Sequence, residues 1–131
     1  MLIDYESIIK IVLAVIIGTV IGYERKKAGK PIGSRTLALV CVSTAFIVIL
    51  GQTYIPLEIG RVLQGILTGL GFLGAGAIIA HGKNIIGLTT AATIWSIAIL
   101  GIAIGFGEYI LTAIVAIIIF TLLTLGKVHT K

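Results

Sequence analysis

The sequence predicts an all-α membrane protein of about five transmembrane helices. Hydrophobic residues make up 58% of the 131-residue chain, whereas charged residues make up only 11%. A soluble domain carries about 25% charged residues, so this chain could not cover its own surface in water. The apolar residues also fall into long runs, and a helix needs about 20 such residues to cross a bilayer.

Five apolar runs are candidates for the membrane-spanning helices. Each is longer than the roughly ten residues of a β-barrel strand, which favours helices over strands. The first residues are acidic where a secretory signal peptide is basic, so the first run is not expected to be cleaved. We expect one transmembrane domain over residues 1–131 and no soluble C-terminal domain. The spans lie near 8–23, 37–55, 62–80, 88–106 and 109–125.

Basic residues gather in the connections on one side of this arrangement. The first connection reads "ERKKAGKPIGSR", and Lys83 and the tail "KVHTK" fall on the same side, whereas the other side holds only Lys10 and Arg61. Because basic loops stay cytoplasmic, the N-terminus is predicted outside and the C-terminus inside. The bilayer, and not nucleic acid, is thus the partner that the net charge of +5 indicates.

The middle of the chain allows two arrangements. The stretch "GFLGAGAIIAHGKNIIGLTTAA" over residues 71–92 reads either as two spans with a short connection or as a re-entrant hairpin. Irregular backbone is tolerated at membrane depth where protein covers it. The sequence alone leaves both arrangements open.

Residues 69–74, "GLGFLG", match the dinucleotide-binding pattern G-x-G-x-x-G. That site requires a preceding strand and an acidic residue about 20 positions later. Here the glycines lie in an apolar run with no acidic residue between Glu58 and Glu108. Small residues four apart let helices touch closely, so we predict helix packing, with a homodimer seam or ligand-exposed backbone as alternatives. The predicted packing residues are Gly18, Gly22, Gly65, Gly69, Gly71, Gly74, Gly76, Trp95, Gly101 and Gly105.

Two carboxylates are candidate metal ligands. Glu24 follows the first span, and either pairs with Arg35 or binds a cation such as Mg²⁺, which keeps several waters and often uses only one or two carboxylates. Glu58 is a weaker candidate, because a carboxylate at a helix start is stabilised there as a cap, and Arg61 shares its face.

The fourth span carries a polar stripe of Thr89, Thr93 and Ser96. Threonine hydroxyls often bond their own helix carbonyls, and the alternative is a hydroxyl-lined path. Gln64 and Thr90 complete the candidate polar set.

Three stretches together resemble the MgtC/SapB family of bacterial membrane proteins. They read "GYERKK…GSRTLALV", "EIGRVLQGILTGLGFLGAGAII" and "GLTTAATIWSIAILGIAIGFG", and the likeness runs from about Ile17 to Phe106. The resemblance implies an inner-membrane protein linked to growth at low magnesium, and some members are reported to act on the ATP synthase. The family's motif positions fall on Glu24, Arg25, Arg35, Thr36, Glu58, Arg61, Gln64, Gly69, Gly71, Gly74, Gly76, Thr89, Thr90 and Trp95.

This sequence departs from the family at two positions. Glu58 stands where members often carry Asp, and neutral His81 lies where a basic residue is usual. Better-known members also carry a soluble C-terminal domain, which is not expected here.

Two functions remain open at this point. The first is magnesium or other cation homeostasis, with binding or transport at Glu24, Arg35 and the threonine stripe. The second is a non-transporting regulator that docks a partner membrane protein through glycine-rich helix faces. A homodimer or higher homo-oligomer is expected in either case. No catalytic motif is present, so we predict no enzyme activity and no cofactor other than possible Mg²⁺.

Overall fold

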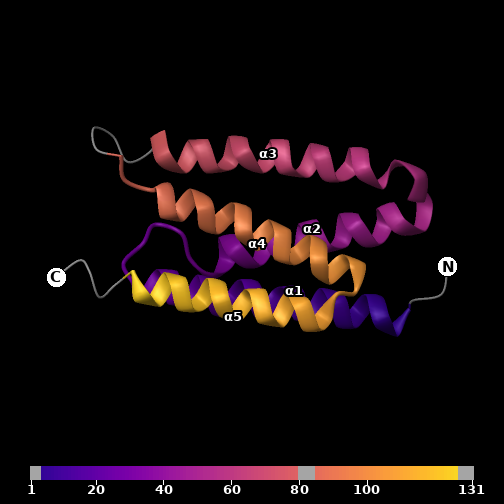
Figure 1. Cartoon of the computed structure of the whole chain (residues 1–131), viewed down its shortest axis with the longest axis horizontal. Helices are drawn as coiled ribbons and strands as arrows, with labels where there is room; N and C mark the ends of the chain where they lie inside the picture. Colours follow the sequence, from indigo (N-terminus) through magenta and orange to yellow (C-terminus); the bar gives the residue numbers. More distant parts are fainter. Residues whose placement is uncertain (1–3, 80–84, 127–131) are drawn as a thin grey trace.

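The computed structural model describes residues 4–79 and 85–126, and these form helices without any strand (Figure 1). The all-helical prediction is therefore confirmed. The elements are α1 (Tyr5–Lys27), α2 (Ser34–Tyr54), the 3-10 helix η1 (Pro56–Glu58), α3 (Ile59–Ile79), α4 (Leu88–Phe106) and α5 (Tyr109–Leu125).

Local sequence signals set the helix ends. The Asp4 side chain accepts a hydrogen bond from the Glu6 amide at 3.1 Å and caps α1. At the other end of α1, the last turn is basic, which suits the negative end of the helix dipole, and Gly29 then turns the chain with a φ of 72°. Pro56 ends α2, because the residue before a proline is disfavoured in the helical region.

The α1 helix is longer at both ends than the apolar run near 8–23 predicts. An apolar run underestimates the length of this helix, because the run stops where charged residues begin, whereas the backbone continues as helix. The last turn of α1 therefore carries Glu24 and Arg25, which the sequence analysis assigned to a connection. This correction matters for the site, since both side chains are buried.

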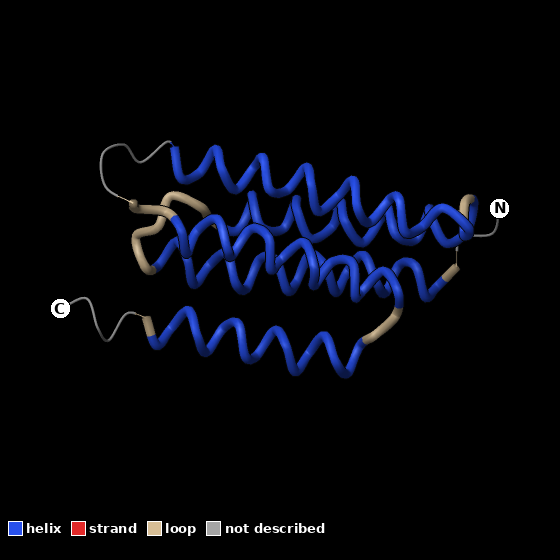
Figure 2. Tube along the Cα trace, turned by 45° about the horizontal axis from the view of Figure 1, so that its top comes forward, coloured by secondary structure: helices blue, strands red, loops and turns tan. Residues whose placement is uncertain are grey.

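The α2 helix lies between α1 and α4, and these three helices form the centre of the molecule. Figures 1 and 2 show α3 and α5 on opposite outer flanks of that centre. The largest fully buried side chains belong to α2 and α4 and are Leu37, Cys41, Val48, Ile97, Leu100 and Ile104. The hydrophobic core thus follows the seam between α2 and α4.

Glycines bring both neighbours close to the backbone of α2. A Cβ added at Gly18 of α1 would lie 2.6 Å from the Ala38 Cα, closer than real Cβ atoms come. On α4, a Cβ at Gly105 would lie 2.7 Å from the Val48 Cβ, and one at Gly101 would collide with the Thr44 hydroxyl. Small residues at these positions are therefore required by the contacts within one chain.

Four of the helices, α1 to α4, are long and apolar enough to cross a membrane. The fifth, α5, has 17 residues and spans about 25 Å, less than the roughly 30 Å hydrocarbon core. The prediction of about five spans is thus supported for four helices, and α5 is a shorter apolar helix. The re-entrant alternative concerns residues that lie partly in 80–84, outside the described residues.

Candidate functional site

A buried ion pair lies at the end of α1. Glu24 and Arg25 are adjacent in the sequence, and their side chains are only 4% and 3% exposed. Both residues are among the motif positions quoted above, but only Glu24 was predicted to be a ligand. The role of Arg25 was not predicted, because neighbouring residues on a helix do not usually face each other.

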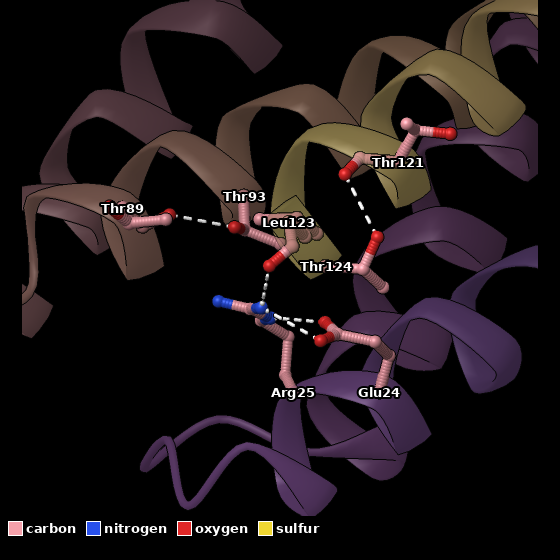
Figure 3. Close-up of polar contacts among 7 residues, drawn as sticks. All are labelled: Glu24, Arg25, Thr89, Thr93, Thr121, Leu123 and Thr124. Carbon is pink, nitrogen blue, oxygen red and sulfur yellow. Dashed lines mark hydrogen bonds and ion pairs between the residues drawn. The ribbon is translucent and has the colours of Figure 1, made fainter. Parts of the chain in front are cut away.

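The guanidinium of Arg25 forms three hydrogen bonds, drawn in Figure 3. Its Nε donates to Glu24 Oε2 at 2.6 Å, and its Nη2 donates to Glu24 Oε1 at 2.9 Å. Nη2 also donates to the backbone carbonyl of Leu123 at 3.0 Å. Because Leu123 lies near the C-terminal end of α5, this contact joins the first helix to the last, where the helix dipole favours a cation.

This arrangement compensates the charge of Glu24. A bidentate arginine occupies both carboxylate oxygens, and an incoming cation would have to compete with it. Burial strengthens that competition, since separating the pair would leave one charge unpaired in a weakly polar environment. Glu24 is therefore better described as one half of a clamp between α1 and α5 than as an open metal ligand.

The expected partner of Glu24, Arg35, is placed differently. Arg35 is exposed in the first turn of α2, and none of the described carboxylates forms an ion pair with it. Together with Lys26, Lys27 and Lys30 it lines a cavity of about 910 Å³ at the α1–α2 connection. The predicted Glu24–Arg35 pair is thus replaced by the Glu24–Arg25 pair.

Glu58 ends η1, which lies between α2 and α3, whereas Glu24 lies in the last turn of α1. Figure 1 shows the α2–α3 connection and the C-terminal end of α1 at opposite ends of the bundle. Its Oε2 is 3.2 Å from the Nε of Arg61, and both side chains are at least half exposed. The predicted shared face of Glu58 and Arg61 is observed, and Gln64 is exposed one turn further along. The two candidate carboxylates of one chain therefore cannot bind the same ion.

The threonine stripe of α4 divides into a buried and an exposed part. Thr90 and Thr93 are buried, whereas Thr89 is exposed. The Thr93 hydroxyl donates to the Thr89 carbonyl at 2.6 Å (Figure 3), as expected for a threonine that bonds a carbonyl of its own helix. A continuous hydroxyl-lined path along Thr89, Thr93 and Ser96 has no support from this bond, which occupies the Thr93 hydroxyl within its own helix.

The glycines of α3 differ from those of α1 and α4. A Cβ at Gly74 would make ordinary contact with Ala91, but one at Gly65, Gly69, Gly71 or Gly76 would meet no atom within 4 Å. Packing against the described residues of the same chain therefore does not explain these four glycines. Trp95, predicted to pack between helices, is instead 45% exposed on the outer surface of α4.

Metal ligands are sparse in the described part of the chain. Among those residues, no three His, Cys, Asp or Glu side chains gather as a metal site. His81 and Lys83 lie outside the described residues.

Comparison with known proteins places the chain in a family. The MgtC family model matches residues 11–131. The chain is 39% identical over 113 residues to the Escherichia coli (strain K12) protein named "Putative magnesium transporter YhiD", covering 79% of this chain and 53% of that protein. It is 38% identical over 105 residues to Protein MgtC of Salmonella typhimurium (strain LT2), covering 80% of this chain and 46% of that protein.

A third relative is aligned over a larger share of its length. Protein SrpB of Synechococcus elongatus is 38% identical over 132 residues, with 89% of this chain and 71% of that protein aligned. The chain spans about half the length of YhiD and MgtC. No solved structure matches it significantly. The resemblance found in the sequence motifs is confirmed, and the chain belongs to the MgtC family of membrane proteins.

Proposed function

We propose that this chain serves magnesium homeostasis in a bacterial inner membrane, and that it acts by docking through α3. The family and the name carried by its relative YhiD support the link to magnesium. The helices long enough to cross a membrane and the basic residues at the α1–α2 connection support an inner membrane, with the N-terminus outside.

The observation that carries the docking proposal is the open face of α3. Of the most apolar stretch in α3, 11% of residues are buried, compared with 50% in α4. Gly65, Gly69 and Gly76 recur at helical spacing, and no described residue of another helix lies within 4 Å of a Cβ added at any of them. Phe72 beside them is 85% exposed. In a bilayer, small residues favour helix association because they permit close backbone contact.

The proposed occupant of this face is a second copy of the chain. Two α3 helices present identical small-residue surfaces, and a two-fold axis makes such a surface complementary to itself. In this dimer the Thr68 side chain, which is exposed on α3, lies at the seam.

Cysteine cross-linking tests the dimer. We expect Thr68→Cys, in a Cys41→Ala background, to form a disulfide-linked dimer when membranes are treated with a thiol oxidant such as copper phenanthroline, and Gly69→Leu to abolish it. Ala92→Leu, at an exposed position of α4, is the matched control and should leave the cross-link intact. Absence of the cross-link in the parent variant, or its persistence with Gly69→Leu, would contradict the α3 seam. Recovery of a different membrane protein on α3 would assign the face to that partner.

A second candidate function is cation handling at Glu24. Its support is a carboxylate only 4% exposed in the last turn of a helix long and apolar enough to cross a membrane, because an ionisable group within a membrane helix marks a functional position by default. Magnesium entry into proteoliposomes, read by a trapped dye, distinguishes the two functions. A non-transporting regulator predicts no entry with folded wild-type protein, whereas the α3 dimer is compatible with either result. Entry that Glu24→Gln abolishes and Lys26→Gln preserves would favour cation handling instead.

A further inference from the structure

We infer that α1 and α5 form a binding site for one anionic phospholipid, with the headgroup at the α1–α2 connection. Three adjoining hollows of different chemistry carry this inference. They follow one another along α1 from an apolar groove, through a mixed middle section, to the basic cavity described above.

The apolar groove lies between α1 and α5 and has a volume of about 330 Å³. Every residue that lines it is apolar, with Ile16 and Val20 on one wall and Ala116 and Phe120 on the other. Such a groove on a helix pair in a bilayer accepts a hydrocarbon chain, because lipid tails are as apolar as its walls.

The middle section joins the groove to the basic cavity. It has a volume of about 490 Å³, shares Val20 and Phe120 with the groove, and shares Tyr23, Lys27 and Ser34 with the cavity. The Glu24 carboxylate also lines this section, but its hydrogen bonds to Arg25 offset its charge. A single elongated molecule can therefore occupy all three hollows.

The basic cavity determines the sign of the headgroup. Lys26, Lys27, Lys30 and Arg35 line it, no carboxylate is among its lining residues, and none of the four basic side chains is in an ion pair with a described residue. A phosphate group suits this site, because arginine and lysine bind phosphate oxygens through charge-assisted hydrogen bonds. Clusters of basic residues next to a membrane helix also attract anionic lipids.

The length of the track fits one lipid leaflet. From Ile16 to Lys27 the α1 helix rises about 16 Å at 1.5 Å per residue. Half of the roughly 30 Å hydrocarbon core is about 15 Å. A free phosphate or a soluble phosphate ester would use the basic cavity alone and would leave the groove unused.

Native mass spectrometry of the purified protein in neutral detergent tests the site, with phosphatidylglycerol and phosphatidylcholine as the probes. We expect phosphatidylglycerol to bind more tightly than phosphatidylcholine. Lys27→Gln combined with Arg35→Gln should weaken its binding about 25-fold, at about five-fold per charge. Arg61→Gln, an exposed arginine at the other end of the bundle, is the matched control and should change nothing.

A groove-filling variant separates a lipid from a free phosphate. Ala116→Phe should reduce phosphatidylglycerol binding, whereas Ala113→Phe, at an exposed position of α5, should not. Should Ala116→Phe fail to fold, Val20→Trp fills the same groove from an exposed position. Equal binding of both lipids would overturn the inference. The inference would also be overturned if two results came together. In the first, glycerophosphoglycerol or inorganic phosphate competes with the lipid at the same concentration as the lipid. In the second, the groove-filling variants leave phosphatidylglycerol binding unchanged.

Discussion

At the scale of single residues, Glu24 and Arg25 form a buried ion pair that also links α1 to α5. Removing one partner from a buried ion pair leaves the other charge uncompensated, at a cost of about 3–5 kcal/mol. We therefore expect Arg25→Gln to lower the free energy of unfolding by an amount of that order. Chemical unfolding in detergent, followed by circular dichroism, measures the change.

Two further variants test whether the loss of unfolding free energy comes from breaking the Glu24–Arg25 ion pair. Lys26→Gln changes the next residue, which is exposed, and should have little effect. Combining Arg25→Gln with Glu24→Gln should cost less than the sum of the single changes, because the double variant buries no lone charge. Strictly additive costs would contradict the pairing of these two side chains.

At the scale of helices, the same residue type has opposite roles in two places. We expect Gly101→Ala to destabilise the chain by about 1–3 kcal/mol, since the added methyl group collides with Thr44 and Cys41 of α2. Gly69→Ala, which meets no neighbour, should be neutral or stabilise α3 by up to about 1 kcal/mol in monomeric protein. Thermal unfolding of both variants in detergent compares them directly, and equal losses would contradict the contrast between α3 and α4.

Much of the fold was predictable from the apolar runs, and the bounds of α4 and α5 match those runs. The glycine spacing also predicted that faces of α1 and α4 pack closely, but spacing cannot name the neighbour. The α2 helix that receives both faces carries no such glycine pair. It contributes Ser34, Ala38, Thr44 and Val48, and only the folded arrangement shows that these residues lie opposite glycines.

The site was less predictable than the fold for a physical reason. Glu24 was identified because a charge near membrane depth is costly, and that argument does not depend on the tertiary structure. Its partner depends on rotamers and on where α5 ends, which no local pattern encodes. The observed partner of Glu24 is therefore Arg25 and not Arg35, although both arginines belong to the basic stretch around the α1–α2 connection.

At the scale of the whole molecule, the helices place the basic α1–α2 connection and the α2–α3 connection at opposite ends (Figure 1). If the basic end faces the cytoplasm, Lys30→Cys should react with a membrane-impermeant maleimide only after cells are permeabilised. Leu57→Cys, at a residue 97% exposed, should react in intact cells. Both variants use a Cys41→Ala background so that only the introduced thiol can react with the maleimide. The reverse pattern would invert the orientation, and labelling from one side alone would contradict the opposed connections.

The bond from Arg25 to the Leu123 carbonyl also joins two residues that are synthesised far apart in time. The ribosome releases Arg25 almost a hundred residues before its acceptor, so the nascent chain must hold this cation without its final partner while α2, α3 and α4 are inserted. Completion of α5 then supplies the carbonyl and closes the contact between the first helix and the last. A chain interrupted before Leu123 lacks that acceptor, and we expect membrane proteases to degrade it faster than the full chain in a pulse-chase experiment. The bond between Arg25 and Leu123 can therefore form only after α5 has been synthesised.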